Sequence, residues 1–167
     1  CELVVQLTAL GGDLGATHSQ AISGSFARVE FSLSYLTGIR LWDVDNPALY
    51  QLNISIGGTN FSHQFSTRVG FRQAEFTADG FLLNGRKLKL RGINRHQSYP
   101  YVGYAMGDHA QKADADLIKN EFKFNLVRTS HYPQAPAFLD RCDELGLLVF
   151  EEIPGWQHIG DELWQQG

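Results

Sequence analysis

The sequence lacks the long apolar runs and basic tracts that mark membrane-spanning and nucleic-acid-binding proteins. None of its apolar runs approaches the ~20 residues that a transmembrane helix needs. The formal net charge is −4, and acidic and basic residues are interspersed, so no basic arm or cationic amphipathic stretch stands out. We therefore expect neither a nucleic acid nor a membrane among the partners of this chain.

Only two cysteines are present, and they offer neither a disulfide framework nor the spacing of metal ligands. Cys142 falls on the apolar face of a predicted helix, where we expect a buried and inert thiol. The chain starts at Cys1, within a predicted strand, and shows no charged region followed by an apolar core that would mark a signal peptide. This start favours a segment of a longer protein, so the compartment stays unknown.

Residues 1–75 are predicted to form an antiparallel β-sandwich. Apolar and polar residues alternate with period two, and Gly and Asn-Pro turns separate the runs, as is typical of sandwiches. The expected strands cover residues 2–7, 25–33, 49–56, 61–65 and 69–71. His18 and His63 are single histidines, and no titratable side chains cluster in this half. We expect it to support a site that lies elsewhere.

From residue 76 the pattern changes to a hairpin followed by alternating strands and helices. The hairpin is expected around residues 81–83, between the turn signals Asp79-Gly80 and Asn84-Gly85. Three apolar runs follow, and two stretches of helical period separate them. Their expected boundaries are Asp108 as an N-cap, Pro136 in a first turn and Gly146 as a C-terminal stop. This order predicts a βαβαβ unit with parallel strands.

Each of the three apolar runs ends in polar, titratable residues. These ends are Asn94-Arg95-His96, Arg128-Thr129-Ser130-His131-Tyr132 and Glu151-Glu152. In parallel α/β sheets, ligands bind at the C-terminal ends of the strands. We therefore interpret the three ends as part of an active-site wall.

Arg128 and His131 are the main candidates for the chemistry of this wall. The guanidinium can pair with a carboxylate and hold it ionised, and the imidazole can donate to a hydroxyl or to a developing charge. The alternative is that Arg128 makes a structural salt bridge and His131 caps a loop. Their positions alone leave both interpretations open.

Several segments carry a resemblance to a known family. Around the strand ends they are Arg91-Gly92-Ile93-Asn94-Arg95-His96, Arg128-Thr129-Ser130-His131-Tyr132-Pro133 and Cys142-Asp143-Glu144-Leu145-Gly146. Upstream they are Leu41-Trp42-Asp43-Val44-Asp45-Asn46-Pro47-Ala48-Leu49-Tyr50, Val69-Gly70-Phe71-Arg72 and Asp79-Gly80-Phe81-Leu82-Leu83-Asn84-Gly85-Arg86. In this order they resemble glycoside hydrolase family 2, which contains β-galactosidases, β-glucuronidases and β-mannosidases. The resemblance covers residues 41–158.

The resemblance implies a multidomain fold that combines β with α/β structure. An immunoglobulin-like antiparallel β-sandwich would occupy residues 1–75, and the first βαβαβ part of a (β/α)8 TIM barrel would occupy residues 76–167. Family members cleave β-glycosides with retention, using an acid/base and a nucleophilic glutamate ~5–5.5 Å apart. In the family these glutamates end barrel strands 4 and 7, which would lie beyond the C-terminus of this chain.

We therefore expect the whole protein to be a retaining exo-β-glycosidase and these 167 residues alone to be inactive. A β-galactosidase is the first expectation, and a β-glucuronidase or β-mannosidase is the alternative. A noncatalytic carbohydrate-binding or assembly module is an alternative of a different class.

The resemblance also implies roles for individual residues. Contacts to a β-linked carbohydrate substrate are expected from His96, Arg128, His131 and Trp156. Arg128 would lie against the nucleophile and lower its pKa, and the two histidines would hydrogen-bond sugar hydroxyls. Trp156 would stack on a sugar ring or, alternatively, pack in the core of its loop. Supporting roles are expected for Asn94, Arg95, Glu151 and Glu152.

The sequence departs from the family pattern in two places. Gln97 stands where many relatives have Glu, so a carboxylate contact is lost there. Residues 151–158 resemble the Glu-x-Pro-Gly form of their loop and lack the Glu-x-x-x-Glu-x-His arrangement of Mg²⁺-dependent members, although His158 is a single candidate ligand. We expect no metal site and no cofactor from these residues, and Mg²⁺ is left open for the whole protein. Because an open three-stranded edge is costly, we expect the βαβαβ part either to associate with another chain, as in a homo-oligomer, or to be partly disordered.

Overall fold

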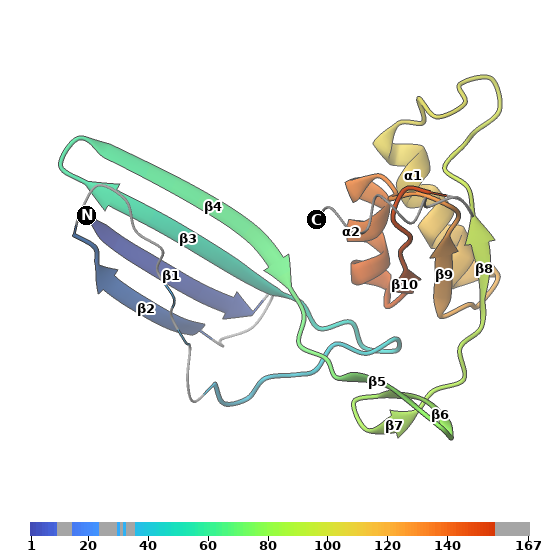
Figure 1. Ribbon diagram of the computed structural model, residues 1–167, viewed down its shortest axis with the longest axis horizontal. Helices are drawn as coiled ribbons and strands as arrows, with labels where there is room; N and C mark the ends of the chain where they lie inside the picture. The colour runs from blue at the N-terminus through green and yellow to red at the C-terminus, as the bar shows by residue number, and fades with distance from the viewer. Residues whose placement is uncertain (10–14, 24–29, 31, 33–35, 156–167) are drawn as a thin grey trace, which may run out of the picture. The chain divides into compact units, whose positions relative to one another are not determined.

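The computed structural model describes residues 1–9, 15–23, 30, 32 and 36–155 (Figure 1). The chain divides into two compact units. The first comprises Cys1–Asp43 and Ala48–Gln73, and the second comprises Val44–Pro47 and Ala74–Gly167. None of the described helices is long and apolar enough to cross a membrane.

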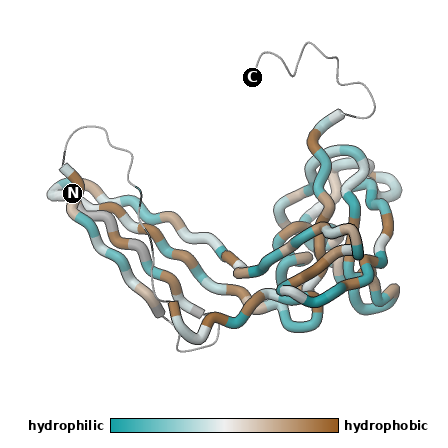
Figure 2. Tube along the Cα trace, turned by 60° about the horizontal axis from the view of Figure 1, so that its bottom comes forward, coloured by the Kyte–Doolittle hydropathy of each residue, from teal (hydrophilic) through white to brown (hydrophobic). Residues whose placement is uncertain are grey.

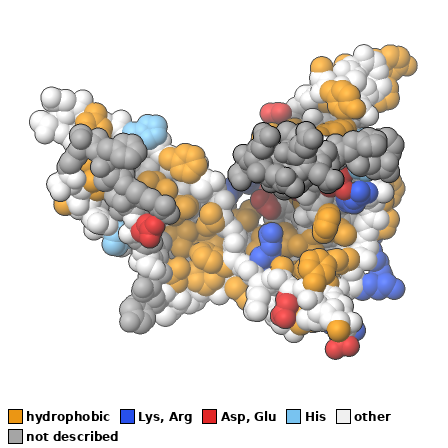
Figure 3. All heavy atoms as spheres, viewed as in Figure 1, with side chains coloured by type: hydrophobic (Ala, Val, Ile, Leu, Met, Phe, Trp, Pro, Cys, Tyr) orange, Lys and Arg blue, Asp and Glu red, His pale blue; other side chains and the backbone are white. Residues whose placement is uncertain are grey.

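The first unit contains a four-stranded antiparallel sheet with the strand order β2-β1-β3-β4. Its strands are β1 (Glu2–Ala9), β2 (Gly15–Ala21), β3 (Tyr50–Gly58) and β4 (Phe61–Val69). Apolar and polar residues alternate along β3 (Figure 2), as expected for a strand whose side chains point to opposite faces in turn. The sequence predicted β1, β3 and β4. Phe61 and Phe65 of β4 are exposed, and hydrophobic side chains gather on the visible face of this unit (Figure 3).

Two expectations for this unit need correction, and a third lies largely outside the described residues. Residue 69 ends β4 and residues 70–73 form no strand, so the separate strand expected at 69–71 is wrong. Strand β2 was not predicted. Of the expected strand at 25–33, only residues 30 and 32 are described.

The second unit starts with a three-stranded antiparallel meander in the order β5-β6-β7. Strands β5 (Ala74–Thr77), β6 (Gly80–Leu83) and β7 (Arg86–Lys87) contain the predicted hairpin. Asn84 and Gly85 form its second turn with φ angles of 52° and 75°. A two-residue hairpin turn in which both central residues have positive φ favours the sequence Asn-Gly, so the local sequence explains the turn.

The predicted βαβαβ unit follows and is confirmed. Its parallel strands are β8 (Gly92–Arg95), β9 (Leu126–Thr129) and β10 (Leu148–Phe150), with β9 in the middle. Helix α1 (Asp108–Asp116) continues into a short π-helix, η1 (Leu117–Glu121), and α2 (Pro136–Leu145) forms the second crossover. Gly107, not Asp108, is the N-cap of α1, and Asp108 lies in the first turn, where its negative charge favours the helix dipole.

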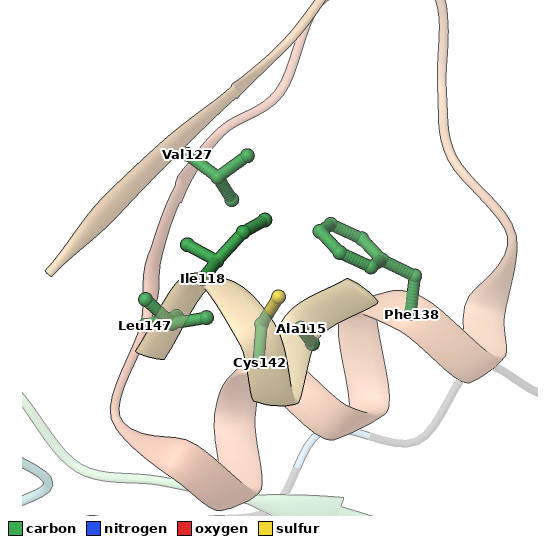
Figure 4. Packing of buried hydrophobic residues seen from close by; sticks show 6 residues of the cluster. All are labelled: Ala115, Ile118, Val127, Phe138, Cys142 and Leu147. Carbon is green, nitrogen blue, oxygen red and sulfur yellow. The ribbon is translucent and has the colours of Figure 1, made fainter. Parts of the chain in front are cut away.

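A small apolar core joins the helices to one face of the parallel sheet (Figure 4). It is formed by Ala115, Ile118, Val127, Phe138, Cys142 and Leu147. Cys142 is fully buried, as expected, and this burial raises the pKa of its thiol to about 12. The thiol therefore stays protonated at neutral pH and behaves as an apolar core group.

Gly146 ends α2 and also touches a segment that comes from far upstream. Its φ of 76° is the left-handed C-cap conformation that glycine adopts without strain. A Cβ at this position would lie 2.3 Å from the carbonyl oxygen of Val44. Lys119 joins the same two places, because its Nζ donates to the carbonyl oxygens of Val44 at 2.6 Å and of Gly146 at 3.0 Å. The segment 44–47 is thereby fixed against the βαβαβ unit.

The Gly146→Ala variant should be clearly less stable than the matched Gly85→Ala variant. Gly85 has nearly the same φ, but nothing lies within 4 Å of a Cβ built there. Gly85→Ala should therefore cost only the left-handed strain of about 1–2 kcal/mol. Gly146→Ala should cost about 1–3 kcal/mol more, because the methyl group collides with the Val44 carbonyl. Urea unfolding followed by circular dichroism gives both values, and equal losses would contradict the contact with Val44.

Candidate active site

The polar residues that follow β8, β9 and β10 lie at one edge of the parallel sheet. The register aligns Asn94, Arg128 and Phe150 across the three strands. Val127 packs in the core with the helices, so Arg128, the next residue, points to the opposite face. Arg128 Nη1 donates to Asn94 Oδ1 at 3.3 Å, which places both side chains on that face.

Glu152 connects the two main candidate residues through its carboxylate. Its Oε1 forms an ion pair with Arg128 Nη2, and its Oε2 lies 2.8 Å from His131 Nδ1. The backbone N–H of Glu152 donates to Thr129 Oγ1 at 2.8 Å, which fixes the chain just after β10. The side chain of Arg128 is 40% exposed and that of His131 is 26% exposed, so both remain accessible from the solvent side.

The pKa of Glu152 lies below its ordinary value. Partial desolvation acts to raise it, but the hydrogen bonds from His131 and Arg128 and their charges together lower it. The carboxylate is therefore ionised at neutral pH and can only accept hydrogen bonds. His131 must then carry a proton on Nδ1, which fixes the tautomer of its neutral ring with Nε2 as an acceptor.

A row of aromatic rings extends from this ion pair. The ring of His131 meets that of His96 edge to face, with centroids 5.7 Å apart. His96 lies 6.3 Å from Tyr132, and Tyr132 lies 5.7 Å from Tyr104. Tyr132 was not singled out from the sequence, although its place directly after His131 at a strand end was a usable signal. His96, Arg128 and His131 are thus brought together as neighbours.

Arg95 points the other way and is buried between the sheet and the helices. Its guanidinium pairs with Asp114 at 2.8 Å, donates to Gln111 at 2.7 Å and to Gln134, and lies 3.9 Å from the centre of the Phe138 ring. A buried charge needs such partners to offset its desolvation. These contacts join β8 to α1 and to the loop before α2.

The remaining predicted residues lie in different places. Glu151 is exposed beside Glu152, and Trp156 and His158 lie outside the described residues. Gln97 joins two loops, because its Oε1 accepts from the backbone N–H of Ala135 and its own N–H donates to Tyr132 Oη at 3.0 Å. The peptide bond between Ser130 and His131 is cis.

No group of three or more His, Cys, Asp or Glu side chains that could hold a metal ion occurs among the described residues. What the site does offer is a cation, two imidazoles and an ionised carboxylate at the edge of a parallel sheet. This set suits the recognition of hydroxyl groups and the stabilisation of a further negative charge.

Models of protein families match nearly the whole chain. Residues 74–165 match the model of the glycosyl hydrolases family 2 TIM barrel domain, and residues 3–72 match the model described as glycosyl hydrolases family 2.

Individual relatives are similar over much of this chain. A β-galactosidase of Thermoanaerobacterium thermosulfurigenes is 60% identical over 136 residues, which cover 81% of this chain and 19% of that protein. A putative β-glucuronidase of Formosa agariphila is 42% identical over 75% of this chain and 16% of its own length. The crystal structure of a Bacteroides uniformis β-glucuronidase superimposes with a TM-score of 0.81 at 31% identity, covering 96% of this chain and 20% of that one. The chain therefore spans less than a fifth of the length of these two curated relatives.

The Arg128→Met variant should raise the pKa of Glu152, because one of the two side chains that favour its charged form is lost. In the folded wild type, Arg128 and His131 stabilise the ionised carboxylate of Glu152. This contribution to stability is fully present above pH ~4.3, the ordinary pKa of Glu, and it is lost as the pH falls through the lower pKa of Glu152 in the folded protein. A ¹³C NMR titration of the Glu152 carboxyl group measures the shift. Glu144→Gln, which removes a carboxylate paired with Arg141 instead, is the control and should leave the pKa unchanged.

Proposed function

The chain belongs to glycosyl hydrolase family 2, and from this premise we propose that the whole protein is a retaining exo-β-glycosidase. Terminal β-galactosides are the proposed substrates, and β-glucuronides and β-mannosides are the alternatives. The observation that carries the proposal is the contact of Arg128 and His131 with Glu152, with His96 next to His131, at the C-terminal edge of the first three barrel strands.

In this proposal Arg128 serves the nucleophilic carboxylate of the whole protein. Retaining hydrolysis requires one glutamate that is ionised and attacks the sugar, and another that is protonated and assists the leaving group. A guanidinium next to the nucleophile lowers its pKa and keeps it ionised. Arg128 has five N–H donors, and its contacts with Asn94 and Glu152 orient the group while its side chain stays partly exposed.

His131 and His96 are proposed to bind hydroxyl groups of the sugar. Glu152 holds the Nδ1 proton of His131, so the neutral ring offers Nε2 as an acceptor to a sugar hydroxyl. A hydrogen bond to a sugar hydroxyl that strengthens as charge develops in the transition state contributes directly to the rate. Glu152 is a positioning residue here, because both of its oxygens are engaged by Arg128 and His131.

We further propose that residues 1–75 form an immunoglobulin-like sandwich. The four-stranded sheet would be one of its layers, and the exposed apolar residues of β4 support a covering layer. Within the described residues β8 and β10 each pair on one side only, which supports the proposal that another part of the protein or a second copy covers these edges.

In the full-length protein, His131→Asn should lower kcat/KM for a nitrophenyl β-galactoside about 10²-fold, as expected when one hydrogen bond that strengthens in the transition state is lost. The substitution removes the proposed hydroxyl contact and the imidazole partner of Glu152 Oε2, while the ion pair of Glu152 with Arg128 remains. The matched control is His109→Asn, which changes an exposed histidine of α1. Its kcat/KM should stay at the wild-type value. The proposed role is wrong if the two variants have the same activity.

The isolated 167 residues should not hydrolyse nitrophenyl β-galactoside, because the carboxylate pair of a retaining glycosidase is proposed to come from later barrel strands. Release of nitrophenol is followed against a buffer blank, and circular dichroism checks that the chain is folded. Hydrolysis above the blank by the folded chain would refute this part of the proposal. A folded, inactive chain whose full-length form is also inactive would favour a noncatalytic carbohydrate-binding module instead.

A further inference from the structure

The loop between β8 and α1 is held in one conformation at both ends and at its tip. At its start, Gln97 binds Tyr132 and Ala135, as described above. Near its end, Met106 is buried, with its sulfur 3.8 Å from Arg95 Nη2. At the tip, Tyr99 and Gly103 exchange two backbone hydrogen bonds of 3.0 Å and 2.9 Å. A loop fixed in this way loses little entropy when it binds a ligand.

This loop nevertheless exposes three tyrosines to solvent. Tyr99, Tyr101 and Tyr104 are all more than half exposed, and Tyr104 is 67% exposed. Orange side chains are visible over this loop at the upper right of Figure 3. Tyrosine combines a large rigid surface with a polar tip and is therefore well suited to bind amphipathic ligands. These exposed rings make the loop a candidate binding surface.

The row of rings connects this surface to the candidate active site. Tyr104 is its outer member and packs edge to face on Tyr132 at an interplanar angle of 83°. Tyr132 is in turn next to His96, and His96 is next to His131. A ligand that occupies the histidine end and extends along the row therefore reaches Tyr104 next.

We propose that Tyr104, supported by its ring contact with Tyr132, binds the leaving group of the substrate. This inference rests on the proposed function, which assigns the histidine end of the row to the sugar that is retained during cleavage. The group on the other side of the cleaved bond would then meet the face of Tyr104. The chemistry of that surface favours a leaving group with a ring, either a second pyranose or an aromatic alcohol.

The test compares full-length wild type and Tyr104→Ala on three glycosides that share one sugar. Their leaving groups are nitrophenol, a second sugar and methanol. Because kcat/KM includes only the steps up to departure of the leaving group, it reports on this contact. The ratio of kcat/KM for each ring-bearing substrate to that for the methyl glycoside should fall about three- to tenfold, as expected for the loss of one aromatic contact.

Three further variants protect the test against a folding defect. Tyr104→Phe keeps the ring and should keep the wild-type ratio of kcat/KM values. Tyr101→Asn should lower this ratio less than Tyr104→Ala does. Asparagine is chosen at position 101 because it tolerates the φ of 70° found there. Phe122→Ala removes an exposed aromatic residue outside this row and should leave the ratio unchanged.

Each outcome of this experiment supports or overturns the proposed role of Tyr104. An active wild type with the same ratio in Tyr104→Ala would overturn the inference and leave the proposed function intact. If Tyr104→Ala also changed the sedimentation coefficient, the surface would be an interface between copies of the chain. A full-length wild type that cleaves none of the three substrates would overturn the proposed function, and the inference with it.

Discussion

A guanidinium buried at the end of the first barrel strand holds the surroundings of the site together. Arg95 joins β8 to α1 through Asp114 and Gln111, and to the loop before α2 through Gln134. Each buried acceptor left without a donor would cost about 1–3 kcal/mol, so these elements cannot separate easily. The arrangement of the loops after β8 and β9 therefore depends on the buried guanidinium of Arg95 and its hydrogen-bonded partners.

The two loops are joined again above this charge. Gln97 from the first loop binds Tyr132 and the start of α2, and Thr129 from the second strand binds the backbone of Glu152 after β10. Side chains from three strand ends are thus held in fixed relation before any ligand arrives. Preorganisation of this kind is what makes hydrogen bonds effective in catalysis, because no reorganisation is needed as charge develops. The hydrogen bonds of Gln97 also fix the start of the loop between β8 and α1, which carries Tyr99, Tyr101 and Tyr104.

Local sequence signals predicted the parts of the fold that depend on local chemistry. Helix α2 has Pro136 in its first turn and Gly146 at its end, and both boundaries agree with the structure. The edge strand β2 was missed because Gly15–Ala21 contains few apolar or β-branched residues, and its pairing with β1 decides its conformation. The expectation of a strand at 69–71 failed because Val69 pairs with Tyr50 as the last residue of β4.

The site was predictable at the level of strand ends but not of individual contacts. Which of Glu151 and Glu152 faces Arg128 depends on the register of β10 against β9, since a shift of one residue exchanges the two faces of a strand. That register pairs Leu148 with Leu126 next to the core residues Val127 and Leu147, and it cannot be obtained from the two adjacent glutamates. Its consequence is chemical as well as geometric. Because Glu152 pairs with Arg128 through one oxygen and with His131 through the other, one carboxylate fixes the orientation of both the guanidinium and the imidazole. A shift of one residue in β10 would turn this carboxylate to the other face of the strand and remove the link between the two side chains.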